Sequence, residues 1–191
     1  MNKILKLRTD KGEQAMMKFL VFLGAAVALC APPVNAEPPQ LKSATPVIYL
    51  ADNLDEKDKL GWCIDTKGRG FAETLQAHTC KPAGRGQDTQ FSYDVKSGQI
   101  RSVPYKGKCM TLSDPKNKSV PFGLLDCVSG KASQKFVYDA GSKEIRIADD
   151  TSKCVVVAAA SRSAGPFMSR DMTYADCASI DSKFKQWVVV K

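Results

Sequence analysis

The apolar residues of the chain fall into one long N-terminal run followed by a series of short segments. Residues 19–31 (FLVFLGAAVALCA) form the uninterrupted run. Beyond residue 46 the apolar stretches are short, rich in β-branched and aromatic residues, and separated by glycines, as is typical of strands joined by turns. No segment of this part sustains a helical apolar period, so the pattern predicts an all-β structure. Its first strand-like segments are 47–50, 62–64, 74–78 and 91–93.

The N-terminal run has the layout of a secretory signal peptide. A basic residue precedes it, and Val34-Asn35-Ala36 after it is a small-x-small cleavage pattern. The run is shorter than the roughly 20 apolar residues that span a bilayer, which makes a retained anchor or a buried core helix the weaker interpretation. We therefore expect residues 1–36 to be a signal peptide of bacterial type that is cleaved after Ala36. Met16 or Met17 is a better start than the first residue, so residues 1–15 are a candidate misassigned extension.

Cleavage would change the charge and the cysteine count. The full chain of 191 residues has a net charge of +8 and seven cysteines; without the leader, which includes Cys30, there are 155 residues, a charge of +5 and six cysteines. The expected product is periplasmic or secreted and has no integral membrane segment. Its modest, unclustered positive charge predicts no nucleic-acid partner. With His78 as the one histidine and no C-x2-C pair, P-loop or hydrolase motif, we expect no metal and no cofactor.

The six remaining cysteines mark an internal threefold repeat. The first cysteine of each pair recurs after 46 and then 45 residues, and an aromatic residue with a glutamine within two positions follows each second cysteine. In the first two copies an isoleucine follows the aromatic residue after nine positions, at Ile100 and Ile145. The glutamine and aromatic markers are Gln90 with Phe91, Gln134 with Phe136, and Gln186 with Trp187.

Six cysteines in an exported chain indicate three disulfides. Six cysteines permit fifteen pairings, and the repeat selects one of them, because the same local bridge then occurs three times. The expected bridges are Cys63–Cys80, Cys109–Cys127 and Cys154–Cys177.

The repeat also predicts how the chain is organised. About four strands in each copy make about twelve strands, which suits a closed all-β body. Residues 37–46, with three prolines, are expected to form an extended leader that contributes little to the core. The folded domain is then 47–191, with copies at about 47–92, 93–137 and 138–191.

These motifs resemble the ricin B-type lectin family. The resemblance rests on Cys63-Ile64-Asp65, which matches C-x-D, on the second cysteine after a strand, and on the glutamine–aromatic markers in place of Q-x-W. It covers about residues 46–191, although only the third copy has tryptophan and only the second has glutamine at the Q-x-F spacing. It implies an all-β β-trefoil, with twelve strands in three pseudo-symmetric repeats, that binds carbohydrate, commonly galactose or N-acetylgalactosamine.

The alternation of side chains in strands brings polar residues of the first copy together. Residues two apart share a face of a strand, so Cys63 and Asp65 project to one side of theirs, and Gln76, His78 and Cys80 to one side of theirs. A Cys63–Cys80 bridge would bring these sides together around one hollow. A sugar pocket needs such groups, because carboxylates and amides bridge hydroxyls and an aromatic ring stacks on the sugar.

The resemblance assigns roles to the same residues. Asp65 occupies the position of the sugar-bridging aspartate, His78 that of the stacking aromatic residue, and Gln76 a polar pocket position. Asp88 lies where the family has a hydrogen-bonding asparagine, and Gln90 lies near the glutamine that supports the aspartate, shifted by one. Asp65 as the start of a turn, His78 as an ordinary strand residue and Asp88 as a solvated charge are the alternatives.

The other two copies lack this polar set and are expected to be structural. The aspartate, stacking and glutamine positions hold Thr111, Leu125 and Gly123 in the second copy, and Val156, Ala175 and Thr173 in the third.

The sequence favours a non-enzymatic lectin that binds a galactose-type glycan through its first copy. Its partner would be a glycan or glycoconjugate, with a host or envelope glycoprotein as one form. The alternative is a protein-interaction or receptor-binding subunit with degenerate sugar sites, as in similar trefoils of bacterial toxins such as the cytolethal distending toxins. A glycosidase that uses Asp65 with Asp88 is disfavoured, because the family uses this fold as a binding module.

Overall fold

The computed structural model describes residues 37–191, so the predicted signal peptide and extension lie outside the described residues. The described chain consists of strands and three short 3-10 helices, which confirms the predicted all-β class. None of its helices is long and apolar enough to cross a membrane. The elements are β1 (Val47–Leu50), β2 (Trp62–Thr66), β3 (Leu75–Thr79), β4 (Phe91–Asp94), β5 (Gln99–Ser102), β6 (Lys108–Leu112), β7 (Phe122–Asp126), η1 (Ala132–Gln134), β8 (Phe136–Asp139), β9 (Glu144–Ile147), β10 (Asp150–Ala164), β11 (Phe167–Asp176), η2 (Cys177–Ser179), η3 (Ser182–Phe184) and β12 (Trp187–Val190).

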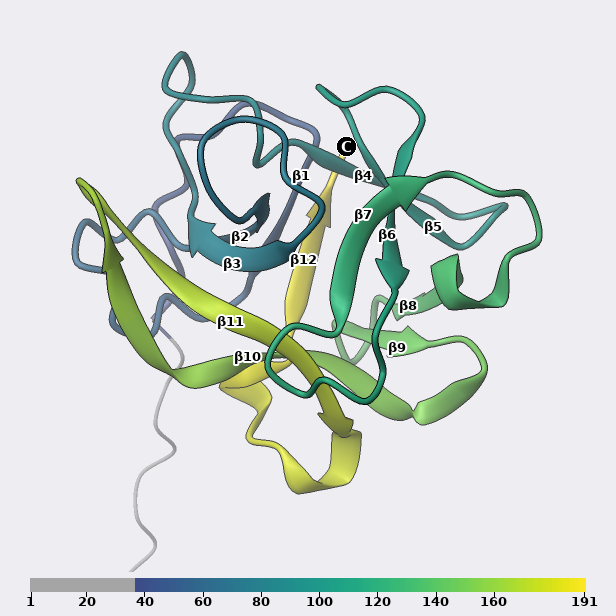
Figure 1. Cartoon of the computed structure of the whole chain (residues 1–191). Helices are drawn as coiled ribbons and strands as arrows, with labels where there is room; N and C mark the ends of the chain where they lie inside the picture. The colour runs from purple at the N-terminus through teal and green to yellow at the C-terminus, as the bar shows by residue number, and fades with distance from the viewer. Residues whose placement is uncertain (1–36) are drawn as a thin grey trace, which may run out of the picture. The chain divides into compact units, whose positions relative to one another are not determined.

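The strands form a strongly curled antiparallel arrangement (Figure 1). Eight strands follow the order β12-β1-β2-β3-β11-β10-β9-β8, and the other four follow the order β4-β5-β6-β7. β1 pairs with β12 from Val47 opposite Val190 to Leu50 opposite Trp187. The first and last strands of the domain are therefore hydrogen-bonded neighbours, and the two ends of the domain meet in one sheet.

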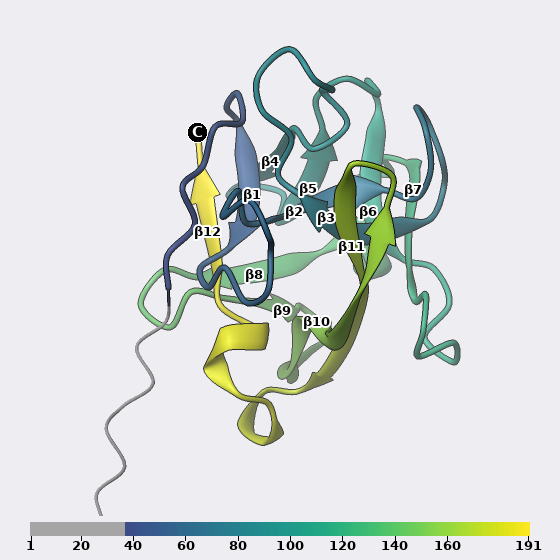
Figure 2. The same ribbon diagram turned by 90° about the vertical axis from the view of Figure 1, so that its left-hand side faces the viewer.

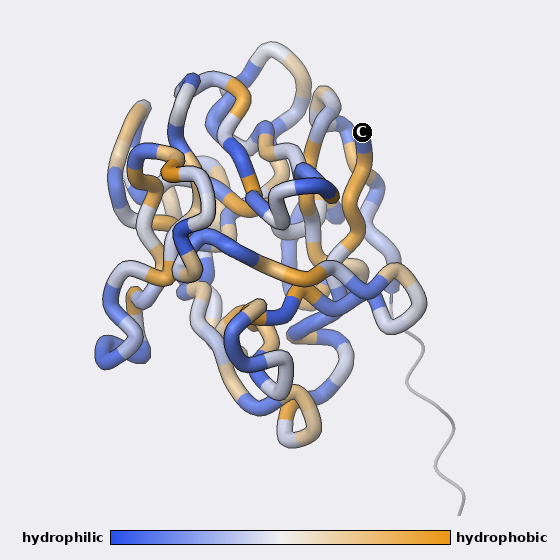
Figure 3. The backbone as a smooth tube through the Cα atoms, turned by 90° about the vertical axis from the view of Figure 1, so that its right-hand side faces the viewer, coloured by the Kyte–Doolittle hydropathy of each residue, from blue (hydrophilic) through white to orange (hydrophobic). Residues whose placement is uncertain are grey.

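The aromatic markers of the repeat lie in the hydrophobic core. Phe91, Phe136 and Trp187 begin β4, β8 and β12 and are almost completely buried. Ile100 and Ile145 belong to the same core cluster. Blue and orange stretches alternate along the tube in Figure 3, as expected for short strands with one face toward a core. The spacing of the markers in the sequence thus identified core positions.

Equivalent hydrogen bonds join successive aromatic markers of the repeat. The Tyr93 hydroxyl donates to the Phe136 carbonyl at 3.0 Å, and the Tyr138 hydroxyl donates to the Trp187 carbonyl at 3.1 Å. Each tyrosine lies two residues after one marker and bonds to the next marker along the chain. These bonds of partly buried hydroxyl groups therefore recur with the period of the repeat.

The three predicted disulfides are confirmed: Cys63–Cys80, Cys109–Cys127 and Cys154–Cys177. Each bridge joins a cysteine in β2, β6 or β10 to the cysteine just after β3, β7 or β11. Three such bonds are characteristic of proteins that fold in an oxidising environment.

The β10–β11 hairpin is longer than its counterparts. β10 and β11 contain 15 and 10 residues, whereas β2, β3, β6 and β7 contain five each. The hairpin reaches from the third copy to the first, where β11 pairs with β3 at Ser169 opposite His78 and Arg170 opposite Ala77 (Figure 2). Part of the first copy is therefore covered by a segment about ninety residues away in sequence.

Arg170 holds this hairpin in place from inside the protein. The ladder between β10 and β11 is irregular in its middle, and the carbonyls of Ala158 and Ala159 accept hydrogen bonds from Arg170 Nη1 at 2.6 and 2.5 Å. The Arg170 guanidinium lies 4.6 Å from the centre of the Trp62 ring, and its Nη2 donates to Asp55. One buried cation therefore satisfies carbonyls that the irregular ladder leaves unpaired and joins them to the core.

Residues 37–46 form no strand or helix before Val47, yet they bind along the first copy. The Gln40 N–H donates to the Lys59 carbonyl at 2.6 Å, and Leu41 packs against the cluster formed by Val47 and the first disulfide.

Each disulfide should stabilise the folded protein mainly because it restricts the conformations of the unfolded chain. Replacing Cys109 and Cys127 together by alanine should lower the free energy of unfolding by about 3 kcal/mol, because the bridge closes a short loop. Denaturant unfolding measures this change. Val95→Ala on an exposed side chain should change it by less than about 0.5 kcal/mol. A double variant as stable as Val95→Ala would contradict the assignment of this bridge as a stabilising element.

Candidate functional site

The pairing of β2 with β3 brings the predicted polar residues of the first copy together. Cys63 lies opposite His78, and Asp65 lies opposite Gln76. The expected convergence of Asp65, Gln76 and His78 beside the first disulfide is therefore present, and it follows from strand alternation and register.

Asp65 lies beneath this face, with no exposed surface. Its Oδ2 is 2.9 Å from Lys81 Nζ, and its Oδ1 accepts the Thr66 backbone N–H at 2.7 Å. Lys81 Nζ also lies 2.6 Å from Asp88 Oδ2. One largely buried ammonium group thus links two carboxylates, and Asp65 has an internal partner.

Burial controls the protonation of this group. Burial raises the pKa of the Asp65 carboxyl from 3.8 to about 6, because loss of water disfavours the charged form; Lys81 opposes the rise and Asp88 adds to it. Burial alone would lower the pKa of Lys81, but the two carboxylates outweigh it and hold that pKa above its ordinary value. Lys81 is therefore charged across the physiological range, whereas Asp65 gains a proton in mildly acidic solution.

His78 and Gln76 are also engaged within the protein. Burial lowers the pKa of His78, so its ring is neutral at pH 7, and its Nδ1 lies 3.0 Å from the Thr79 carbonyl. His78 is only 6% exposed, and its ring meets Phe167 edge-on, with centroids 5.7 Å apart. Gln76 Oε1 accepts a hydrogen bond from Arg162 at 3.2 Å. His78 consequently offers little open face for a sugar to stack on.

A pocket of about 540 Å³ opens above these residues. Its walls come from the turn after β2, from β3, from the loop between β3 and β4, and from the tip of the β10–β11 hairpin. The lining residues are Lys67, Gly68, Arg69, Gly70, Gln76, His78, Lys81, Arg85, Asp88, Ala164, Gly165, Pro166, Phe167 and Ser169.

Asp88 is the carboxylate that the pocket presents. Its Oδ2 binds Lys81, while its Oδ1 is buried and has no hydrogen-bond partner among the described residues. Gly86 supports this position, because its φ is +149° and a Cβ there would lie 2.9 Å from Asp88 Oδ1 and 3.0 Å from Lys81 Cδ. A glycine is thus needed where the loop passes over the ion pair.

Gln90 lies apart from the other predicted residues. Its Nε2 donates to the Thr45 carbonyl at 3.0 Å, and Gln90 does not line the pocket. The shift of one position that distinguishes Gln90 from the family glutamine thus directs its side chain toward the start of the domain.

Sequence reasoning missed the two residues that most change the site, Lys81 and Phe167. Lys81 directly follows Cys80, after β3 has ended, so strand alternation did not place it. Phe167 belongs to the third copy and reaches the site only because β10 and β11 are long. The separation of 23 between Cys154 and Cys177, against 17 and 18 in the other pairs, was the available signal of this extension.

In the second copy, the positions equivalent to the first-copy site are occupied by a network of internal hydrogen bonds. Gln134 is fully buried, and its Nε2 donates to Thr111 Oγ1 at 2.9 Å and to the Asp126 carbonyl at 2.8 Å. Its Oε1 accepts the Val128 N–H at 2.8 Å. The glutamine of the Q-x-F marker thus supports a threonine where the family has its aspartate.

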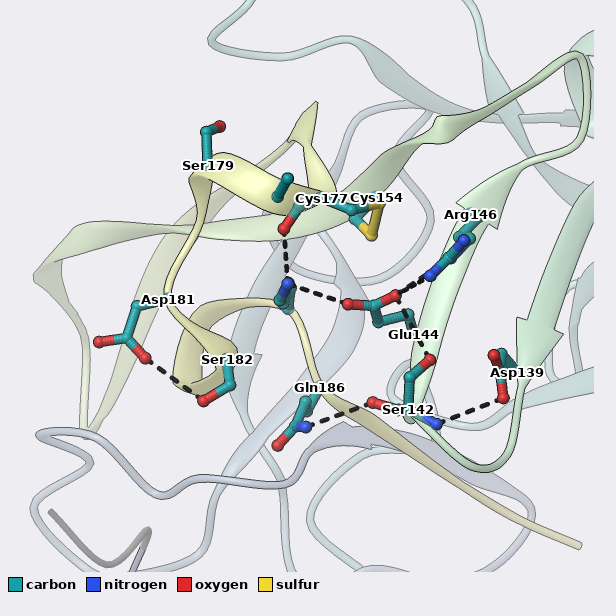
Figure 4. Close-up of polar contacts among 12 residues, drawn as sticks. Asp139, Ser142, Glu144, Arg146, Cys154, Cys177, Ser179, Asp181, Ser182 and Gln186 are labelled. Atoms are coloured by element: carbon teal, nitrogen blue, oxygen red, sulfur yellow. Dashed lines mark hydrogen bonds and ion pairs between the residues drawn. A yellow bond between two sulfur atoms is a disulfide. The ribbon is translucent and has the colours of Figure 1, made fainter. Parts of the chain in front are cut away.

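The third copy has an ion-pair network instead (Figure 4). Lys185 Nζ lies 2.9 Å from Glu144 Oε1, and Arg146 Nε donates to Glu144 Oε2 at 3.0 Å. Glu144, Cys154 and Cys177 bring potential metal-ligating atoms within 4.8 Å of one another, but the two sulfurs are bonded in a disulfide. The cluster is therefore a structural ion pair beside a disulfide.

The carboxylates of the first copy do not form a glycosidase pair. Such enzymes present two carboxyl groups to the bond that they cleave. Here Asp65 has no exposed surface, and Lys81 Nζ joins it to Asp88.

The raised pKa of Asp65 should be directly visible. The carboxyl carbon of Asp65 should titrate by NMR with a midpoint near pH 6. Because the folded protein holds this proton more tightly than the unfolded chain, the contribution of Asp65 to the free energy of unfolding should rise as the pH falls from about 6 to about 4. A midpoint at or below pH 4 would contradict the burial of this group.

Removing the partner of Asp65 should be costly. Lys81→Met should lower the free energy of unfolding at pH 7.5 by about 3–5 kcal/mol, because it leaves a buried carboxylate uncompensated. The loss should shrink at pH 5, where Asp65 is protonated. Lys153→Met, which removes a half-exposed pair with Asp176, is the matched control and should cost less than about 1 kcal/mol. Equal losses in the two variants, measured by denaturant unfolding, would exclude this role for Lys81.

Comparisons with known proteins agree with this architecture. The family model of the ricin-type beta-trefoil lectin domain matches residues 54–187. A solved structure described as the solution structure of the mdaA-1 domain has a TM-score of 0.50 and 15% identity, and the match covers 82% of this chain and 98% of that one, which indicates a shared fold. No curated protein matches the chain. The chain belongs to the ricin-type beta-trefoil lectin family, a carbohydrate-binding and generally non-catalytic family.

Proposed function

We propose that the protein is an exported, non-enzymatic lectin that binds a galactose-type glycan through the pocket of its first copy. The observation that carries this proposal is the pocket itself, because it combines polar groups with an aromatic side chain beside the C-x-D motif of the family. Membership in a carbohydrate-binding family supports the ligand class, and the three disulfides support export to an oxidising compartment.

The complete β-trefoil symmetry is part of this proposal. Twelve strands in the described chain divide into three sets of four, and each set carries its disulfide between the same elements. The hydrogen bonds of Tyr93 and Tyr138 repeat from one copy to the next. These equivalences support copies close to 47–92, 93–137 and 138–191, with the first specialised for binding.

Within the pocket, the proposed roles differ from those expected of the family. Phe167 provides the stacking surface, because it is partly exposed at the pocket wall while His78 is covered. Asp88 provides the acceptor for sugar hydroxyls, since it is the one carboxylate of the pocket lining and its side chain is partly exposed. Asp65 acts from below by holding Lys81, and therefore Asp88, in position.

The other copies are proposed to be structural. Gln134 and Thr111 satisfy one another in the second copy, and Glu144 pairs with Lys185 in the third. In the third copy the aspartate and stacking positions hold Val156 and Ala175, and the Thr173 hydroxyl at the glutamine position is buried, although it has no hydrogen-bond partner among the described residues. A role as a protein-interaction subunit remains the alternative, and a protein captured in the absence of any glycan binding would support it.

Loss of Phe167 should weaken sugar binding selectively. Phe167→Ala should reduce the affinity for a galactoside by about tenfold, because a stacked aromatic side chain contributes about 1 kcal/mol beyond its buried area. NMR titration or calorimetry measures the change. Phe71→Ala, which removes an exposed aromatic ring outside the pocket, is the matched control and should leave the affinity unchanged.

Thr111→Ala in the second copy should likewise leave binding intact. If Phe167→Ala binds galactosides as well as the unmodified protein, the pocket of the first copy is not the binding site. Loss of binding in Thr111→Ala would assign binding to the second copy instead.

A further inference from the structure

The charges around the pocket of the first copy are strongly unbalanced. Lys67, Arg69, Lys81 and Arg85 line it, and Asp88 is the one acidic residue of the lining. Asp65 below adds a second carboxylate, but it is fully covered and bound to Lys81. The surface that a ligand meets is therefore positive.

Three of these cations have no ion pair among residues 37–191. Lys67, Arg69 and Arg85 are exposed, and none of them lies within ion-pair distance of a described carboxylate. Many other basic residues of the domain do have such partners, for example Arg162 with Asp171 at 2.8 Å and Lys108 with Asp126 at 2.8 Å. The charges of these three pocket cations are therefore not neutralised by an ion pair with a described residue.

The shape of the site limits what can use these charges. A volume of about 540 Å³ is within the range of small-ligand sites, and Phe167 forms an apolar wall beside the cations. An adjoining pocket of about 610 Å³ shares Arg85, Pro166 and Phe167 and includes Lys42. The combined surface suits a short saccharide that crosses Phe167, with a ring against the aromatic side chain and an anionic group at the guanidinium groups.

We propose that this pocket selects an acidic saccharide, one that carries a carboxylate or sulfate group, over its neutral counterpart. The proposal rests on the lectin function proposed above and specifies the ligand class of the same site. Guanidinium groups match the geometry of both anions, because their N–H donors form paired hydrogen bonds with two oxygens. The unpaired cations also attract an anion over a distance before contact is made.

Protonation of Asp65 strengthens the same preference. The Asp65 carboxyl has neighbours from three elements. Thr66 on β2 donates its backbone N–H to it, and Lys81 in the loop after β3 binds it and links it to Asp88. His78 Nδ1 on β3 lies 3.7 Å from Asp65 Oδ2. Arg162 approaches the neighbouring Gln76 from the hairpin. Loss of the Asp65 charge below about pH 6 leaves Lys81 less neutralised, so anion binding should tighten rather than weaken in mild acid.

The test compares two sugars that differ at one position. Methyl galacturonide carries a carboxylate where methyl galactoside carries a hydroxymethyl group. The purified protein should bind the galacturonide at least about tenfold more tightly at low ionic strength, and this advantage should fall as salt is added, while binding of the galactoside stays nearly constant. The 6-sulfated galactoside shows whether sulfate replaces carboxylate. Calorimetry or NMR titration measures the affinity of the protein for each of the three sugars.

Charge-reversal variants locate the effect. Arg69→Glu with Arg85→Glu should abolish the preference for the acidic sugar. Lys116→Glu with Lys143→Glu makes the same change in net charge at exposed lysines outside the pocket and should keep the preference. Thermal unfolding of both double variants establishes that each is folded.

The outcomes separate the two proposals. Equal affinity for the acidic and neutral sugars, or a preference that survives Arg69→Glu with Arg85→Glu, overturns the proposed selectivity and leaves the lectin function in place. No binding of any of the three sugars overturns both. A single-stranded oligonucleotide that binds as tightly as the galacturonide shows a general attraction for anions and also overturns saccharide selectivity.

Discussion

The burial of Asp65 is the constraint on which the first-copy site depends. A carboxylate without exposed surface must find a partner, and the ammonium group of Lys81 at 2.9 Å is that partner. Lys81 in turn holds Asp88, so the orientation of the pocket's carboxylate depends on Asp65, which has no exposed surface. The C-x-D motif is thus present in the sequence, while its aspartate is an internal support beneath the pocket.

The sequence predicted the framework of the protein well because the framework repeats. Three cysteine pairs at a nearly constant interval determined the disulfides, and the aromatic markers Phe91, Phe136 and Trp187 identified core positions. Alternation along β2 and β3 was enough to bring Asp65, Gln76 and His78 to one face. Each of these inferences uses local geometry, which strands of known register obey strictly.

The parts that the sequence did not predict are those that break the repeat. Lys81 enters the site from a loop, where alternation no longer holds, and Phe167 enters from a distant hairpin. Gln90 matched the family pattern except for a shift of one position, and that shift moved its side chain to the Thr45 carbonyl. Whether a polar residue is free or already paired depends on contacts between distant segments, which strand patterns do not encode.

The long β10–β11 hairpin has an evolutionary consequence. Its tip supplies Phe167, while Arg170 anchors its middle to the Trp62 ring and to the carbonyls of β10. Changes in length or composition at residues 164–167 can therefore alter what the pocket accepts without disturbing the anchor or the shared core. Duplicated copies ordinarily diverge one by one, but this connection lets changes in the third copy reshape the pocket of the first.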